Sequence, residues 1–136
     1  MIGVGAVIED EKGRILPVKH VPEKGGYWYD KWICPGGKLE YGETIEQGII
    51  REIKEETDLD IKLTTPLVPF ERIVGNGEEA ELHVIYIDYL AELVGGEAKP
   101  ADDVGEAIWV KKEELTNIWD ELHEDTKRLF KIARVI

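Results

Sequence analysis

The sequence predicts an α/β fold in which a mixed β-sheet is covered by helices. Three observations support this prediction: β-rich segments near the start of the chain, an amphipathic helical pattern after Thr44, and a second helical pattern near the C-terminal end. Each helical pattern has an apolar stripe that needs a sheet face to pack on, so the elements fit a layered arrangement. No linker or change of composition divides the 136 residues, and we expect a single domain over residues 1–136.

The first part of the chain alternates β-rich segments with turn and loop sequences. Turn residues such as Gly, Pro and Asp bound each run of β-branched and aromatic residues. The expected elements in order are strand 2–9, turn 10–14, strand 15–20, loop 21–31, strand 32–35 and a second loop that begins at Gly36 and Gly37.

The next segment has a well-marked helix start. Thr44 is followed three residues later by Gln47, which is the spacing of a capping box. Ile45, Ile49, Ile50 and Ile53 then recur at helical spacing and form an apolar stripe. The pattern predicts a helix that ends near Thr57 and Asp58.

The second half returns to strand patterns and closes with a helix. In order, we expect strand-like segments at about 60–74 and 81–93, a loop at 95–105, a short strand at 106–110, a helical turn from Lys111 and a C-terminal helix at about 119–134. Leu122, Leu129, Phe130 and Ile132 give that last helix its apolar positions.

Composition and charge exclude several classes of protein. The formal net charge is −12, and such an acidic surface repels the phosphates of DNA or RNA, so no nucleic-acid polymer is expected as a partner. No apolar run approaches the ~18 residues that would span a bilayer, so no membrane association is expected. A single cysteine, Cys34, leaves no internal disulfide, and the absence of a signal-like N-terminal pattern favours a cytoplasmic location.

Three glutamates are crowded at the end of the predicted first helix. With ~100° per residue and Ile45 at zero, Glu52 and Glu56 fall within about 20° of the apolar stripe's edge, and Glu55 lies further round. Carboxylates at this spacing repel one another, and the helix C-terminus is itself partly negative. A hard divalent cation would relieve the repulsion, whereas a solvated acidic helix face is the alternative that the helix alone leaves open.

The residues around these glutamates resemble the signature of the Nudix hydrolase family, G-x5-E-x7-R-E-U-x-E-E-x-G-U, with U apolar. The matching positions are Gly37, Glu43, Arg51, Glu52, Ile53, Glu55, Glu56 and Leu59. Asp58 stands where the family has its last glycine, which puts the local turn in doubt more than the chemistry, because Asp adopts a left-handed helix cap less readily than Gly. The motif covers under a fifth of the chain, although the flanking segments also have the family's pattern.

The resemblance implies a Nudix-type α/β/α sandwich that hydrolyses a nucleoside diphosphate linked to another group X. By the same resemblance Glu52, Glu55 and Glu56 would ligate Mg²⁺ or Mn²⁺, with the Gly36 carbonyl as a further ligand. Arg51 would orient these carboxylates through a salt bridge, and Glu43 would support the junction of loop and helix. The metal would neutralise the phosphates and activate the attacking water.

The catalytic base is less well defined, because the family often places it in a loop before the last strand. The acidic residues in that region are Glu97, Asp102, Asp103 and Glu106. Glu106 aligns best and is the candidate for a catalytic or metal-binding role, while each of the four also fits an ordinary surface acid.

Several other residues are candidates for substrate contacts. Lys19 and Lys38 fit phosphate contacts, although both also fit ordinary surface lysines. Trp28 and Tyr29, with Tyr27, lie on a glycine-flanked loop and fit stacking on a nucleobase, or cover of a sheet edge or a homodimer contact. Trp119 is a further stacking candidate. Cys34 has no His nearby in the sequence to activate it and fits a small buried apolar residue.

Three functions follow from this reading. The first is a metal-dependent pyrophosphohydrolase of ADP-ribose or a nucleotide sugar, favoured by the pattern of residues 87–110. The second is a house-cleaning triphosphatase acting on nucleotides such as oxidised dGTP, suggested by the PGGKLEYGET segment. The third is a non-catalytic nucleotide sensor, which is disfavoured because such proteins usually lose the glutamates that are kept here.

Overall fold

The computed structural model describes residues 1–20, 27–28, 30–75, 81–101 and 104–136. Its elements in chain order are β1 (Ile2–Glu9), β2 (Arg14–Ile15), β3 (Val18–His20), β4 (Trp32–Ile33), β5 (Gly36–Lys38), α1 (Ile45–Thr57), β6 (Asp60–Pro66), β7 (Phe70–Val74), β8 (Leu82–Gly95), β9 (Val104–Ala107), β10 (Val110–Lys111), the 3-10 helix η3 (Lys112–Glu121) and α2 (Glu124–Ile132).

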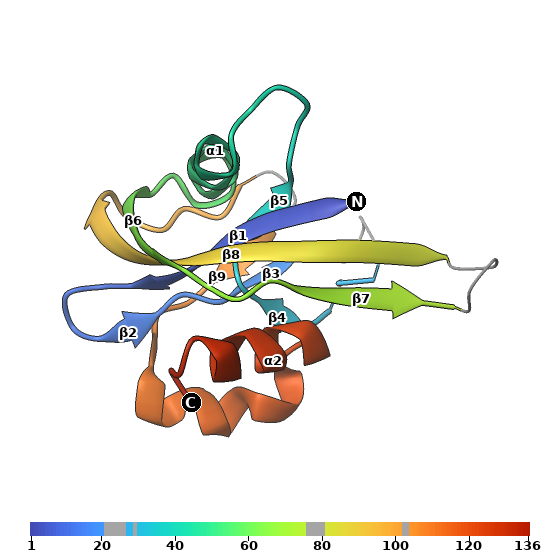
Figure 1. The fold of residues 1–136 in the computed structure, drawn as a ribbon. Helices are drawn as coiled ribbons and strands as arrows, with labels where there is room; N and C mark the ends of the chain where they lie inside the picture. Colours follow the sequence, from blue (N-terminus) through green and yellow to red (C-terminus); the bar gives the residue numbers. More distant parts are fainter. Residues whose placement is uncertain (21–26, 29, 76–80, 102–103) are drawn as a thin grey trace.

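The sheets form the middle layer, with α1 on one face and α2 and η3 on the other (Figure 1). The main sheet has the order β10-β2-β1-β8-β6, with β5 also paired to β1 and β7 also paired to β8. β1 and β8 are parallel while their other neighbours are antiparallel, so the sheet is mixed. A second sheet has the order β4-β3-β9. The predicted mixed sheet covered by helices is confirmed.

β1 runs through the middle of the main sheet and is buried on both faces. Val4, Ala6 and Ile8 belong to the core on the α1 side, whereas Val7 belongs to the core that contains the buried residues of α2. This division follows from the alternation of side chains along a strand. A strand covered on both faces reads as a continuous apolar run, as residues 2–9 do.

The first helix has the predicted boundaries. The Thr44 hydroxyl accepts a hydrogen bond from the Gln47 backbone, and the Gln47 side chain accepts one from the Thr44 backbone, which is the expected capping box. At the other end Asp58 adopts the left-handed conformation, with φ 60°, and its N–H bonds the Lys54 carbonyl. Asp58 therefore occupies the position at which a glycine is usual.

Several sequence-based boundaries are wrong. The strand expected at 15–20 is two strands in different sheets, because Pro17 lacks the N–H that would continue the ladder. The glycines expected to begin a loop form β5, since a backbone without a Cβ can lie against β1: a Cβ on Gly36 would be 2.2 Å from the Val4 oxygen. The helix expected at 119–134 begins only at Glu124, where His123 caps it by accepting the Asp125 N–H at 3.0 Å.

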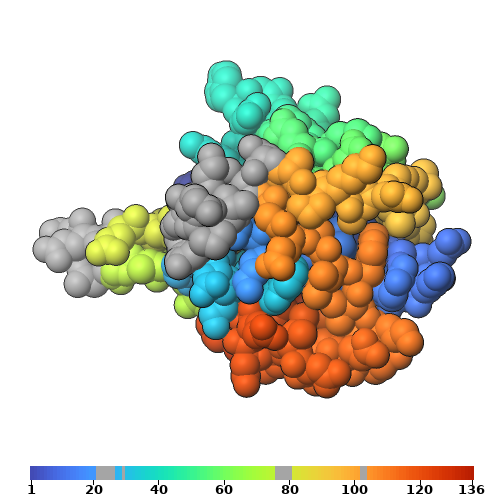
Figure 2. Space-filling model, turned by 180° about the vertical axis from the view of Figure 1, so that it is seen from behind, coloured from blue at the N-terminus to red at the C-terminus, as the bar shows by residue number. Residues whose placement is uncertain are grey.

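The strand expected at 60–74 is also divided, into β6 and β7, which both pair with β8. The short strand expected at 106–110 is β9 followed by β10. Seen from behind, the orange segment after β8 lies between the green region of α1 and the red region of η3 and α2 (Figure 2). None of the helices among the described residues has the length and apolar character that a membrane crossing requires.

Candidate active site

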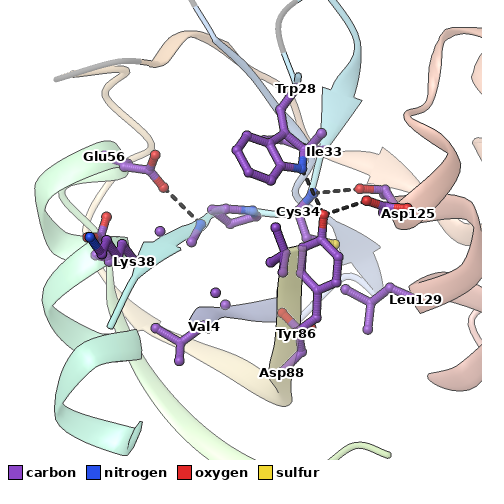
Figure 3. Close-up of a pocket in the computed structure, with 18 of the residues that line it drawn as sticks. Val4, Trp28, Ile33, Cys34, Lys38, Glu56, Tyr86, Asp88, Asp125 and Leu129 are labelled. Atoms are coloured by element: carbon purple, nitrogen blue, oxygen red, sulfur yellow. Dashed lines mark hydrogen bonds between the residues drawn. The ribbon is translucent and has the colours of Figure 1, made fainter. Parts of the chain in front are cut away.

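A cavity of about 520 Å³ opens where β1, β5 and β8 meet the two helical layers. Glu56 and Lys38 lie towards one end, and Asp125 and Leu129 lie towards the opposite end (Figure 3). We call these the carboxylate end and the α2 end. The cavity therefore joins a region on the α1 side of the fold to a region formed by α2.

The floor of the cavity exists because two residues of β1 have no side chain. Gly3 and Gly5 line it, and a Cβ on Gly5 would lie 2.7 Å from the Pro35 oxygen and 2.8 Å from Asp88 Oδ1. These distances are shorter than van der Waals contact. Beside the glycines, Tyr86 and Asp88 of β8 form a wall of the cavity.

Arg51 forms ion pairs with several acidic residues at the carboxylate end. Its guanidinium contacts Glu43 at 2.6 Å, Glu52 at 2.8 Å and Glu55 at 3.3 Å. The hydrogen bonds from Arg51 hold the pKa of Glu43 down at about 2. Glu52 lines the cavity, and a Cβ on Gly37 would lie 2.3 Å from one of its oxygens, so a side chain at that position would displace the Glu52 carboxylate.

Glu56 is the most deeply placed of the three clustered glutamates, with 3% of its surface exposed. Its Oε1 accepts a hydrogen bond from the Gly36 N–H at 2.9 Å, and its Oε2 lies 3.6 Å from Nε2 of His20. Burial raises the pKa of Glu56, while His20 and the Gly36 N–H act in the opposite direction. A buried carboxyl that lines a cavity is costly unless something binds to it there.

The donor set at this end fits a hard divalent cation, because carboxylate oxygens are the ligands that Mg²⁺ and Mn²⁺ prefer. Among the described residues, no three His, Cys, Asp or Glu side chains are arranged as a ready metal-binding group. Arg51 instead places its positive charge against Glu52 and Glu55. The chemistry of the residues thus fits a metal, and Arg51 balances two of the carboxylates in this structure.

The α2 end is built from aromatic and polar side chains joined in one hydrogen-bonded chain. The Trp28 indole N–H donates to the Tyr86 hydroxyl at 2.8 Å, and that hydroxyl donates to Asp125. Asp125 in turn accepts hydrogen bonds from Arg72 at 2.8 Å. Phe70 stacks on Tyr86 with ring centroids 4.8 Å apart. These contacts fix an aromatic wall in place.

The structure brings some of the predicted site residues to the cavity and leaves others away from it. The predicted residues that line it are Gly36, Lys38, Glu52, Glu56 and Trp28, and Arg51 and Glu55 lie beside them through their ion pairs. The predicted residues that do not line it are Lys19, Trp119, Glu97 and Glu106. The Lys19 ammonium lies over the Trp32 ring, and the ammonium groups of Lys127 and Lys131 lie over the Trp119 ring. Tyr29, Asp102 and Asp103 lie outside the described residues.

Glu106 is exposed on β9, where it pairs with Lys19 in register. Its predicted role in catalysis stays a prediction. Cys34 packs against the core on the α2 side and also lines the cavity, and burial together with Asp88 raises the pKa of its thiol, which favours the protonated form.

Sequence reasoning missed several residues of the cavity wall. His20 faces Glu56, and Tyr86, Asp88 and Asp125 line the far part of the cavity. One signal for Asp88 was present, because an acid within the otherwise apolar run VIYIDYLA is unusual for a central strand. The sequence held no equivalent signal for Asp125, which lies among the charged residues that begin α2.

A family model described as "NUDIX domain" matches residues 1–132. The chain belongs to the NUDIX domain family. An "ADP-ribose pyrophosphatase" of Methanocaldococcus jannaschii is 36% identical over 107 residues, which cover 78% of this chain and 59% of the relative. The "Nucleoside triphosphatase NudI" of Escherichia coli is 31% identical over 98 residues, which cover 68% of this chain and 70% of the relative.

A solved structure shows the same fold. It is a "bifunctional NMN adenylyltransferase/ADP ribose pyrophosphatase complexed with AMP and MN ion" from Francisella tularensis. The TM-score is 0.73 and the identity 28%, over 96% of this chain and 40% of that one. The NUDIX chain described here is thus shorter than the archaeal and Francisella proteins that it resembles, and the similarity establishes the Nudix fold and family.

Proposed function

We propose that this protein is a divalent-metal-dependent pyrophosphohydrolase of nucleoside diphosphate derivatives, with ADP-ribose or a nucleotide sugar as substrate. The observation that carries the proposal is the cavity itself, which joins the carboxylates of α1 to an aromatic wall that contains Trp28 and Tyr86. A diphosphate fits the first end and a nucleoside fits the second. The archaeal relative's name supports the ADP-ribose type.

In this proposal Glu52, Glu55 and Glu56 hold Mg²⁺ or Mn²⁺ at the carboxylate end. The bound metal would neutralise phosphate charge and lower the pKa of a bound water. Arg51 keeps Glu52 and Glu55 close together, and Lys38 offers a positive charge to a phosphate at the same end of the cavity. The overall reaction adds water across the phosphoanhydride, so NDP-X and water give a nucleoside monophosphate and phosphorylated X.

The protein's own residues also hold the carboxylates of the site in fixed positions. Glu56 is held in place by the Gly36 N–H, and Glu52 fits against the surface of Gly37 where a side chain is missing. The packed residues of β1 and β5 close the cavity from below. Such fixed positions lower the barrier because the reacting groups need little reorganisation.

A substrate panel tests this proposal. The protein is incubated with Mg²⁺ and ADP-ribose, a nucleotide sugar, a dinucleoside polyphosphate, and normal and oxidised nucleoside triphosphates, and the products are resolved. We expect a nucleoside monophosphate from ADP-ribose, with the activity lost in Glu56→Gln and kept in Glu46→Gln, an exposed position on the same helix. Turnover in ¹⁸O-water identifies the phosphorus that is attacked.

The E. coli relative favours a second candidate, a nucleoside triphosphatase. The same panel distinguishes the two, because that activity releases pyrophosphate from a triphosphate and leaves ADP-ribose intact. Binding of nucleotides without turnover of any compound would overturn both enzymatic proposals and favour a nucleotide sensor.

A further inference from the structure

Asp88 is a buried acid that no contact among the described residues explains. Its side chain lies on β8, only 7% of the residue is exposed, and it lines the cavity. Among the described residues, the structure shows no hydrogen bond or ion pair for its carboxyl group, whereas Glu56 and Asp125 each have partners. Buried polar groups without partners are rare because they cost free energy, so an unpaired one in a cavity wall points to a ligand.

The surroundings of Asp88 show what kind of ligand group would fit. Asp88 Oδ1 and the Pro35 carbonyl oxygen are neighbours: a Cβ on Gly5 would be 2.8 Å from the first and 2.7 Å from the second, so the two oxygens lie no more than about 5.5 Å apart. The Pro35 oxygen already accepts the Ala6 N–H but keeps a second lone pair. Two neighbouring acceptors are complementary to a group with two N–H donors, which an amino group is.

The position of Asp88 in the sheet brings its carboxylate near the carboxylate end of the cavity. Asp88 pairs with Gly5, and Gly5 pairs with Gly36, whose N–H bonds Glu56. A Cβ on Gly5 would lie 2.8 Å from Asp88 Oδ1 and 3.5 Å from the Gly36 Cα, so the Asp88 carboxylate lies no more than about 6.3 Å from the Gly36 Cα. A ligand bound at the carboxylate end is therefore within reach of Asp88.

Charge gives the orientation of the nucleotide. A phosphate brings no donor to Asp88 and would be repelled by a carboxylate, so the diphosphate belongs at the carboxylate end with Lys38 and the metal. Tyr86 lies two residues from Asp88 on the same face of β8 and is held by Trp28 and Asp125. A planar ring beside Tyr86 would present its edge to Asp88.

We propose that Asp88 determines base specificity by accepting a hydrogen bond from the exocyclic amino group of the substrate's nucleobase, with the Pro35 carbonyl as the second acceptor. This assignment rests on the proposed function in one respect, namely that the ligand is a nucleotide. It deepens that function, because it selects bases that carry an amino group, such as adenine, over bases that lack one.

Equilibrium binding tests the proposal without turnover. The probes are AMP and the purine ribonucleoside 5′-monophosphate that lacks the 6-amino group, with Mg²⁺ present, and neither has a phosphoanhydride to cleave. For the wild-type protein we expect AMP to bind about tenfold to a hundredfold more tightly, the worth of a hydrogen bond to a charged or buried acceptor. Asp88→Leu should bind the two probes equally, while Glu92→Gln, an exposed acid on the same strand, should keep the preference.

A second variant controls for the case in which Asp88→Leu does not fold. Asp88→Asn keeps the side-chain volume and one acceptor oxygen, so it should fold and show a reduced preference for AMP. Equal binding of both probes by the wild-type protein, or a preference that survives Asp88→Leu, would overturn the assignment. The same holds if neither probe binds.

The outcome is separate from the test of hydrolysis. If no compound of the substrate panel is cleaved but the wild-type protein prefers AMP and Asp88→Leu does not, the proposed activity fails and the base contact stands. If ADP-ribose is cleaved with no dependence on the amino group, the activity stands and the base contact fails.

Discussion

The acids at the carboxylate end and the acid in the β8 wall of the cavity differ in whether the protein pairs them. At the carboxylate end each glutamate has a partner: Arg51 contacts Glu52 and Glu55, and the Gly36 N–H bonds Glu56. In the wall beside Gly5, Asp88 has no hydrogen-bond partner within the described residues. The glutamates are thus positioned by contacts within the protein, whereas a partner for Asp88 has to come from a ligand that enters the cavity.

The largest expected effect concerns Glu56. Glu56→Gln keeps the size of the side chain and an oxygen for the Gly36 N–H, so the fold should persist. Loss of a metal ligand removes several kcal/mol of transition-state stabilisation, and we expect turnover of ADP-ribose to fall by about 10³-fold or more. Mg²⁺ should raise the melting temperature of the wild-type protein and leave that of the variant unchanged.

Steady-state kinetics and thermal melts with and without Mg²⁺ measure both effects. Glu46→Gln provides the control, because Glu46 is exposed at the start of the same helix. Equal melting temperatures for the wild-type protein with and without Mg²⁺ would contradict the metal-binding role of the carboxylate end.

The next effect concerns the cost of the unpaired Asp88. Burial raises the pKa of Asp88 to about 7 in the folded protein, against an unfolded value of 3.8. Because the folded pKa is the higher one, the free energy of unfolding falls as pH rises from about 4 to about 7, and the full cost is present above pH 7. The shift corresponds to at most about 4 kcal/mol.

Asp88→Asn should therefore stabilise the free protein more at pH 8 than at pH 4, as measured by urea unfolding. Cys34 is the titratable neighbour, and its raised thiol pKa favours the neutral form across this range. A gain that is the same at both pH values would show that the Asp88 carboxyl has a partner in the free protein.

Arg51 should have a smaller effect on stability. Arg51→Ala removes the hydrogen bonds to Glu43 and Glu52 and leaves neighbouring carboxylates to repel, so the free energy of unfolding should fall. Arg51→Lys restores the charge without the planar fork and should recover part of the loss.

The pH dependence has a clear sign. The pKa of Glu43 is lowered to about 2 by Arg51, so the stabilisation is present above the unfolded value of 4.5 and disappears as pH falls towards 2. The difference between the wild-type protein and Arg51→Ala in urea unfolding should thus shrink below about pH 4. A constant difference down to pH 2 would contradict this account of the pair.

The same contrast explains what could be predicted from the sequence. Glu52, Glu55 and Glu56 are close in the sequence and lie on one helix, so their spacing alone indicates a shared site, and the Thr44 cap fixes where that helix starts. The family motif adds Arg51 and the glycines. The cavity floor combines β1, β5 and β8, and no local pattern shows that Gly5, Gly36 and Asp88 lie side by side.

Some predicted boundaries of strands and helices are wrong for a related reason. Gly36 and Gly37 have loop propensity, but the close approach of β1 makes them a strand, and this approach is a tertiary contact. Likewise the last helix begins at Glu124 because His123 caps it, while the preceding residues form a 3-10 helix. The sequence therefore predicts the part of the candidate site that lies on helix α1, and does not predict the part that lies on the strands.

The smallest expected difference compares two glycines of one strand. A Cβ on Gly5 would meet the Pro35 oxygen, a backbone atom, at 2.7 Å, while a Cβ on Gly3 would meet only side-chain atoms, the nearest being Val84 at 3.4 Å. Gly5→Ala should then cost about 1–3 kcal/mol in the free energy of unfolding, as overpacking does, and Gly3→Ala much less.

Gly5→Ala should also fill the space between Pro35 and Asp88 and remove the preference for AMP over the purine nucleotide without the amino group, whereas Gly3→Ala should keep it. Urea unfolding and nucleotide binding measure the two consequences on the same pair of variants. If Gly5→Ala is destabilised but still prefers AMP, the amino group is read elsewhere in the cavity. The pair therefore separates the packing of the floor from its contact with the base.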